Sequence, residues 1–148
     1  MRGILDGVHI VSYHWFLASL TRNQFVPEHD YWIKGDEVVG QVTNAVEKST
    51  KNCKGRGSLF KGLSFCLVGS FGAPSPPKSD LSALITAGGG KVAARKPKSP
   101  TNDLWIIHDG STSIQAFPNE EFPQQALWSQ LLDCISRFSL DPLLSLPK

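Results

Sequence analysis

Hydrophobic residues recur along this chain at spacings that predict a particular series of strands and helices. Apolar and smaller residues alternate in 63–67, which is typical of a strand with a buried face. The run 104–107 is continuously apolar, as expected for a parallel strand buried on both sides. A short strand is predicted at 91–93. Apolar side chains at helical spacing predict helices at 81–85 and 131–138.

The rest of the chain is patterned less strongly. Residues 8–13 are typical of a short strand, and apolar residues at helical spacing follow in 15–20. The segment 41–58 is polar and basic, contains two glycines and has almost nothing to bury, so we interpret it as a flexible linker. A weak, acidic helix interrupted by two prolines is predicted at 115–127.

From residue 59 the predicted order is strand, helix, strand, strand, weak helix and final helix. Strands alternating with helices in this way indicate the α/β class, here a small, mostly parallel sheet flanked by helices. The 148 residues, 41% apolar with four tryptophans, are enough for one ordinary domain or two small ones.

Charge and cysteine usage narrow the class of protein. The net charge of +2 is nearly balanced, which argues against a general nucleic-acid-binding protein. The three cysteines, Cys53, Cys66 and Cys134, lack paired spacing and fit reduced thiols in the cytosol or nucleus. The histidines show no ligand spacing, so we expect no metal or other cofactor. Nothing marks a catalytic nucleophile, a small-molecule substrate site, a signal peptide or a membrane span.

The run Gly88, Gly89 and Gly90 before Lys91 raises the question of a phosphate-binding loop. Such a loop follows a strand and opens a helix, so that the amides at the helix N-terminus face the phosphate. Here the predicted helix comes first, and Val92 stands where a magnesium-binding Ser or Thr is needed. A glycine that closes a helix in a left-handed conformation accounts for the run more simply.

Three stretches together resemble a tandem BRCT region of the kind found in the breast cancer type-one susceptibility protein and its BARD-type RING partner. Residues 3–15, GILDGVHIVSYHW, are similar to the end of a BRCT repeat, with Trp15 as the tryptophan that opens the last helix. Residues 28–40, EHDYWIKGDEVVG, are similar to the start of an inter-repeat linker. The segments 59–63 and 86–98 resemble the first half of a second repeat, with the glycine run as an identifier of the fold.

The resemblance divides the chain into three parts. Residues 1–34 are expected to be the C-terminal strand and helix of a first repeat, 35–58 the inter-repeat linker, and 59–145 the second repeat. The N-terminal part of the first repeat is expected to be missing, as in a truncated product. Residues 1–57 alone are expected to be poorly ordered, because a lone strand and helix bury too little surface.

The resemblance also implies a phosphoserine site, which this chain is expected to lack. In the family, a Ser-Gly pair after the first strand of repeat one and a lysine opening its second helix bind the phosphate, and neither position has a counterpart here. In repeat two the nearest candidates are Gly69 and Ser70, after its first strand. The region 115–127 has no basic residue, and Glu120 and Glu121 would repel a phosphate.

A second family feature is an apolar groove between the repeats, which receives a phenylalanine three residues after the phosphoserine. The resemblance places Leu132 on one wall of this groove, with Pro74 and Ser75 near another. Packing within the core is the competing interpretation of Leu132. The last helix departs from the family pattern, because Gln130 stands where the resemblance places a tryptophan.

By this resemblance the chain is a non-catalytic interaction module of a nuclear DNA-damage-response scaffold. The expected partners are phosphorylated DNA-repair proteins, and the relatives carry a separate RING ubiquitin-ligase domain. The alternative is a DNA- or chromatin-binding module that uses a set of basic residues, namely Lys91, Arg95, Lys96 and Lys98 with Lys48, Lys51, Lys54 and Arg56 of the linker. Binding that weakens steeply with salt would favour this alternative. An unrecognised small α/β enzyme is the remaining rival, and no sequence feature supports it.

Overall fold

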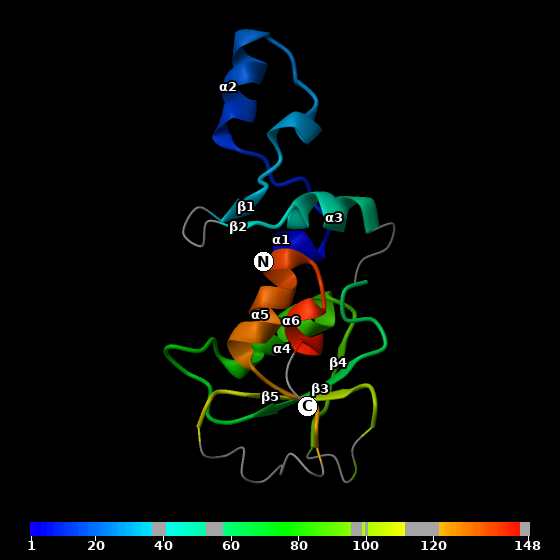
Figure 1. Ribbon diagram of the computed structural model, residues 1–148. Helices are drawn as coiled ribbons and strands as arrows, with labels where there is room; N and C mark the ends of the chain where they lie inside the picture. Colours follow the sequence, from blue (N-terminus) through cyan, green and yellow to red (C-terminus); the bar gives the residue numbers. More distant parts are fainter. Residues whose placement is uncertain (37–40, 53–57, 96–98, 100, 112–121, 146–148) are drawn as a thin grey trace.

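A four-stranded parallel sheet with helices packed on one face forms the C-terminal half of the chain (Figure 1). The computed structural model describes residues 1–36, 41–52, 58–95, 99, 101–111 and 122–145. Its helices are α1 (Arg2–Leu5), α2 (Tyr13–Thr21), the 3₁₀ helix η1 (Glu28–Tyr31), α3 (Ala45–Asn52), α4 (Lys78–Ala87), α5 (Trp128–Arg137) and α6 (Asp141–Leu144). Its strands are β1 (Gly35–Asp36), β2 (Gln41–Val42), β3 (Ser64–Val68), β4 (Lys91–Val92), β5 (Leu104–His108) and β6 (Gln125–Leu127).

The sheet has the strand order β4-β3-β5-β6, and every neighbouring pair is parallel. β3 and β5 are paired along their whole length, from Ser64 opposite Leu104 to Val68 opposite His108. All residues of 104–107 are buried, which confirms the predicted parallel strand. The α/β class with a small parallel sheet is confirmed as well.

Side chains alternate between the two faces of the central strands, so that each strand contributes to two apolar clusters. The larger cluster lies on the helix face, and its fully buried members include Phe60, Phe65, Leu81, Ile85, Ile107, Leu131 and Ile135. The smaller cluster, on the opposite face, contains Cys66, Leu104, Ile106 and Phe122. The predicted apolar face of the helix at 81–85 is therefore confirmed, and it packs against the sheet.

Helix α4 ends at the glycine run. The N–H groups of Gly89 and Gly90 donate to the carbonyls of Thr86 and Ile85, both at 3.0 Å, which is the double hydrogen bond of a Schellman motif. Gly89 has a φ of 84°, a left-handed conformation that glycine adopts without steric cost. The prediction that this run closes a helix is confirmed.

The final strand and helix differ from the prediction. Residues 115–121 lie outside the described part of the chain, and 125–127 form β6 instead of a helix. The backbone there pairs with β5, with Ile107 opposite Ala126, and this pairing outweighs the weak helical pattern. Helix α5 starts at Trp128, three residues before the predicted start, so a tryptophan opens it directly after the strand.

The N-terminal segment has a helix where one was predicted but no regular strand before it. The helix expected at 15–20 is confirmed as α2. The strand expected at 8–13 is wrong, because its described backbone forms only an isolated antiparallel bridge between Val11 and Trp32. The carbonyl of Ile10 accepts a hydrogen bond from the Ile33 N–H at 2.9 Å, which holds this extended stretch beside the segment that follows η1.

The predicted linker contains regular structure. β1 and β2 form a short antiparallel pair, and residues 45–52 form α3. Ala45, Val46 and Ser49 are buried, at successive turns of one face of α3. We expected the linker 41–58 to be flexible and to bury almost nothing. That expectation is wrong for 45–52, because α3 buries one of its faces against another part of the protein.

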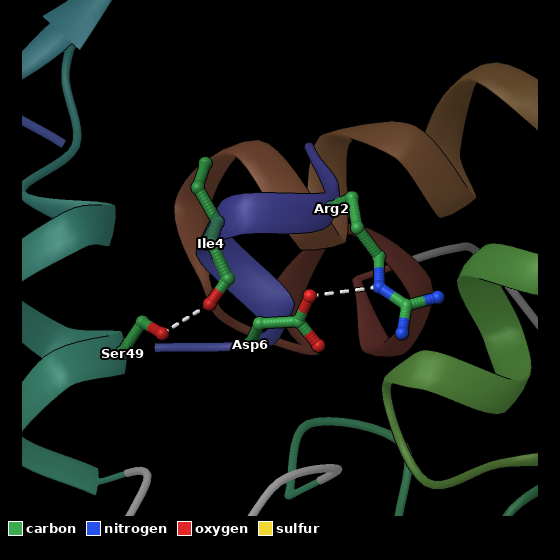
Figure 2. Close-up of polar contacts among 4 residues, drawn as sticks. All are labelled: Arg2, Ile4, Asp6 and Ser49. Carbon is green, nitrogen blue, oxygen red and sulfur yellow. Dashed lines mark hydrogen bonds and ion pairs between the residues drawn. The ribbon is translucent and has the colours of Figure 1, made fainter. Parts of the chain in front are cut away.

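The surface that α3 packs against is formed by α1 together with α5 (Figure 1). Leu5 is only 1% exposed and belongs to the larger apolar cluster of the sheet unit. Figure 2 shows the polar contacts of α1: the Ser49 hydroxyl donates to the Ile4 carbonyl, and the Arg2 Nε lies 2.8 Å from an Asp6 carboxylate oxygen. The N-terminal segment thus joins the core of the C-terminal unit through α1 and α3.

Candidate functional site

The Gly69–Ser70 pair lies at the carboxyl end of β3. Asp109, which follows the neighbouring strand β5, lies close to this pair. Asp109, directly after β5, accepts hydrogen bonds on Oδ2 from the backbone N–H groups of Ser70 at 2.8 Å and Phe71 at 3.3 Å. Its Oδ1 accepts from the N–H of Ser111 at 2.9 Å. The amides that could hold an anion therefore already hold a carboxylate of the same chain.

The conformation of Gly69 makes this contact possible. Gly69 has a φ of 125°, and a Cβ at this position would overlap the Asp109 carboxylate. Hydrogen bonds from Ser111, Phe71 and Ser70 hold the pKa of the Asp109 carboxyl far below its ordinary value of 3.8. The group is therefore fully ionised at neutral pH. Lys78, at the start of α4, places its ammonium 5.6 Å from the centre of the Phe71 ring.

The three residues expected along a peptide groove have other surroundings. Ser75 is buried, and its hydroxyl donates to the Gly72 carbonyl at 3.0 Å and accepts from the Gly72 N–H at 3.1 Å, so it closes its own loop. Pro74 is exposed and follows a cis peptide bond. Leu132 is half-buried and packs against the larger apolar cluster. Ser75 and Leu132 thus have contacts within the fold, and Pro74 lies on the surface.

Trp15 lies within α2, at some distance from the sheet unit in Figure 1. Its indole N–H donates to the Val26 carbonyl at 2.9 Å, and its ring stacks on Phe25 with centroids 5.7 Å apart. These contacts join the helix to the turn that follows it. Five large apolar side chains of this region remain exposed: Tyr13, Phe16, Leu17, Leu20 and Phe25.

A cavity of about 260 Å³ lies between the N-terminal segment and α5. Its apolar lining comes from Ile4, Ile33, Ala45 and Val46, and its polar lining from α5 comes from Asp133, Ser136 and Arg137. An opening of this size is smaller than most cofactor sites and suits one large side chain. We call it the junction cavity.

Two hydrogen bonds hold α3 and its approach against the end of α5, beside the junction cavity. The Thr43 hydroxyl donates to the Ser136 carbonyl at 2.9 Å, and the Lys48 ammonium lies 3.5 Å from the Arg137 carbonyl oxygen. Carbonyls in the last turn of a helix lack helical partners, and a cation near them is favourable. The wall of the cavity is thus fixed by side chains from the segment predicted to be a linker.

Sequence reasoning missed the junction cavity and Asp109. Ala45 and Val46 are small or apolar and stand three and four residues before Ser49. This helical spacing was a signal for a buried helix face in the linker. The signal for Asp109 was its place after β5, because the carboxyl ends of adjacent parallel strands meet at one edge of a sheet. Leu132 lies on α5, whose residues Asp133 and Ser136 line the junction cavity.

The basic candidates near the glycine run lie only partly within the described residues. Lys91 and Arg95 are exposed at and just beyond the edge strand β4, whereas Lys96 and Lys98 lie outside the described residues. The described residues hold no group of three His, Cys, Asp or Glu side chains that suits a metal ion. None of the described helices is long and apolar enough to cross a membrane.

In a comparison against protein families, the BRCT domain matches residues 58–145, which contain the parallel sheet and the glycine run that closes α4. The chain belongs to the BRCT family. BRCT domains are non-catalytic interaction modules, and the module of this chain includes both the sheet and the helix face of the junction cavity.

The curated relatives fall in the BRCA1/BARD1 group. The human BRCA1-associated RING domain protein 1 is 30% identical over 166 residues, which cover 97% of this chain and 20% of that protein. The mouse breast cancer type 1 susceptibility protein homolog is 32% identical over 101 residues, covering 68% of this chain and 5% of that protein. The BRCT chain thus spans at most about a fifth of the length of these relatives.

A solved structure agrees with the fold over nearly the whole BRCT chain. The crystal structure of the S. pombe Brc1 BRCT5-BRCT6 domains superposes with a TM-score of 0.63 and 16% identity. The match covers 95% of this chain and 73% of that one. The likeness therefore extends beyond 58–145 to the N-terminal segment, as far as the fold is concerned.

Proposed function

We propose that this chain is the protein-interaction module of a nuclear DNA-damage-response scaffold and that it binds a partner segment at the junction cavity. The BRCT family and the kinship with BRCA1-associated RING domain protein 1 support an interaction role in DNA repair. In this proposal, 1–34 is the C-terminal part of a first repeat, 35–58 connects the repeats, and 59–145 is the second repeat. The partners are repair proteins that meet the scaffold in the nucleus.

The observation that carries the proposal is the junction cavity. Ile4, Ile33 and Val46 provide an apolar wall, and Asp133 and Arg137 provide charges at the α5 side. An apolar anchor that enters a desolvated pocket, with polar contacts around it, is the arrangement that dominates binding energy in protein interfaces. A peptide with one large apolar side chain therefore suits this cavity.

We further propose that recognition by this chain does not depend on phosphate. Asp109 accepts hydrogen bonds from the amides of Ser70 and Phe71, so these two donors after β3 are not free to bind a phosphate. A fixed carboxylate at this position also repels a second anion. The apolar anchor at the junction cavity then supplies the affinity.

The test is a titration of a fluorescent peptide with a phenylalanine three residues after a serine. Ser136→Phe fills the junction cavity and leaves the Ser136 carbonyl, the acceptor of the Thr43 hydroxyl, in place. Ser79→Phe, at an exposed position of α4, is the matched control. We expect the peptide to bind Ser136→Phe about tenfold more weakly and Ser79→Phe unchanged, provided that circular dichroism shows both to be folded. Equal binding by all three proteins would refute the cavity as the binding site.

A further inference from the structure

We propose that an exposed apolar stripe on α2 is a self-association surface, at which the stripe of one copy of this chain packs against the same stripe of a second copy. The stripe consists of four side chains on one face of α2, namely Tyr13, Phe16, Leu17 and Leu20. It shares no lining residue with the junction cavity, so the inference goes beyond the proposed function.

The stripe has the spacing of a helix–helix contact. Its members stand at positions i, i+3, i+4 and i+7, which lie on one face of an α-helix. Two helices pack along such a seam when apolar residues recur every three or four positions. The four residues are 69%, 48%, 42% and 61% exposed, in chain order. The face that would ordinarily cover a core is thus directed to solvent.

The opposite face of α2 already has partners in the turn that follows the helix. The Trp15 indole N–H donates to the Val26 carbonyl at 2.9 Å, and the Ser19 hydroxyl oxygen accepts from the Val26 N–H at 3.3 Å. The rings of Trp15 and Phe25 stack with their planes 7° apart. These contacts hold α2 by its other face, so the stripe is presented to a partner without a rearrangement of the helix.

A recess of about 490 Å³ lies beside the stripe, between α2 and the turn that follows it. Phe16 and Leu20 of the stripe line this recess together with Trp15 and Phe25. The same surface therefore has a ridge of apolar side chains and a hollow that can receive one. In a two-fold dimer each contact occurs twice, so the ridge of either copy can enter the hollow of the other.

The chemistry of α2 favours a second copy over a charged partner. Residues 13–21 contain no Lys, Arg, Asp or Glu, so two copies of this helix meet without repulsion between like charges. A nucleic acid or an anionic membrane is held mainly by basic side chains along the contact surface, and α2 provides none. An identical uncharged stripe matches this surface in both shape and polarity.

The exposed area is sufficient for a weak dimer. Phe25, beside the stripe, is 85% exposed. With Phe25 the stripe presents roughly 500–600 Å² of apolar surface, since a whole aromatic side chain buries about 150–250 Å². Two copies then bury roughly 1,000–1,200 Å², which is the lower end of the range for specific interfaces. We therefore expect a dissociation constant on the order of 10 µM.

The experiment measures the mass of the full chain by sedimentation equilibrium from about 1 to about 200 µM. Leu17→Glu and Leu17→Lys each place a charge at the middle of the stripe, which meets its own copy in a two-fold pair. Leu144→Glu is the matched control, because Leu144 on α6 is 68% exposed and lies outside the stripe. Circular dichroism establishes that each variant keeps the helix content of the wild type.

We expect the wild type and Leu144→Glu to dimerise, and each Leu17 variant alone to associate at least about tenfold more weakly. An equimolar mixture of Leu17→Glu and Leu17→Lys should restore the dimer, because opposite charges then meet, whereas a folding defect would not be rescued. The inference is wrong if the wild type stays monomeric or forms only larger aggregates, if Leu144→Glu also loses the dimer, or if the mixture stays monomeric. A monomeric wild type would assign the stripe to a different partner. Peptide binding at the junction cavity is measured separately and does not depend on this outcome.

Discussion

The hydroxyl of Thr43 donates a hydrogen bond of 2.9 Å to the carbonyl of Ser136, 93 residues further along the chain. This bond joins the segment before α3 to the last turn of α5, beside the junction cavity. Together with Leu5 in the sheet core, it makes the N-terminal segment part of the same folded unit as the BRCT sheet. The shape of the cavity depends on this junction.

Thr43→Val should destabilise the protein by about 1 kcal/mol, because the Ser136 carbonyl loses its partner while the shape of the side chain is kept. Thr86→Val is the matched control, since the Thr86 hydroxyl donates to the Ser82 carbonyl within α4 on an exposed surface. Urea unfolding of both variants gives the two free energies. A smaller loss in Thr43→Val than in Thr86→Val would argue against a role for the bond at the junction.

Leu5→Ala should cost about 2–5 kcal/mol of stability, as expected for truncation of a fully buried leucine. Leu5 is 1% exposed within the core of the sheet unit, whereas Leu20 on α2 is 61% exposed. Leu20→Ala should therefore cost less than about 0.5 kcal/mol. Thermal unfolding followed by tryptophan fluorescence measures both. If Leu5→Ala is no less stable than Leu20→Ala, α1 is not part of the core.

Gly88→Ala should destabilise the protein by about 1–3 kcal/mol through overpacking, because a Cβ on Gly88 would overlap the ring of Phe60. A Cβ on Gly72 would meet no atom within 4 Å beyond its two chain neighbours, so Gly72→Ala should be neutral or slightly stabilising. Denaturant titrations of the two variants separate the effects. Equal stabilities would show that the glycine run is not required for the approach of Phe60.

The stability advantage of the wild type over Asp109→Asn should depend on pH in a definite direction. The Asp109 pKa is lowered in the folded state from an ordinary value of 3.8, chiefly by hydrogen bonds from Ser111. The contribution of the ionised Asp109 carboxylate to the free energy of unfolding is therefore complete above about pH 5, and it decreases as the pH falls below 3.8. Melting temperatures measured from pH 2 to pH 7 should converge at the acidic end, with the neighbouring His108 common to both proteins. A constant difference, or one that grows in acid, would contradict the role of the carboxylate.

The central elements of the fold could be predicted because their signals are local. The apolar run 104–107 needs burial on both faces whatever its neighbours are, and the glycine run needs a conformation that few other residues adopt. β6 could not be predicted, because pairing with β5 decides its structure and the pattern of 125–127 is too short. For α3, the stabilising surface is formed by Ile4 and the end of α5, which are distant in sequence.

The candidate site was only partly visible in the sequence for the same reason. The resemblance pointed to α5 through Leu132, but the orientation of its face is set by packing on the sheet, which turns Asp133 and Ser136 to the cavity. The Gly69–Ser70 pair was visible as a motif. Its occupation by Asp109 depends on the meeting of β3 and β5 at one edge, which only the strand order reveals.

The most direct test of the account compares one peptide in two forms, with serine and with phosphoserine, each carrying a phenylalanine three residues later. Fluorescence anisotropy gives the dissociation constants of both forms for the full chain and for residues 59–145. We propose that recognition uses an apolar anchor and that Asp109 already holds the amides of Ser70 and Phe71. The dissociation constants of the two peptides for the full chain should therefore agree within about twofold. Residues 59–145 alone should show no preference for the phosphorylated form. A phosphoserine peptide that binds tenfold or more tightly than its unphosphorylated form would contradict the account.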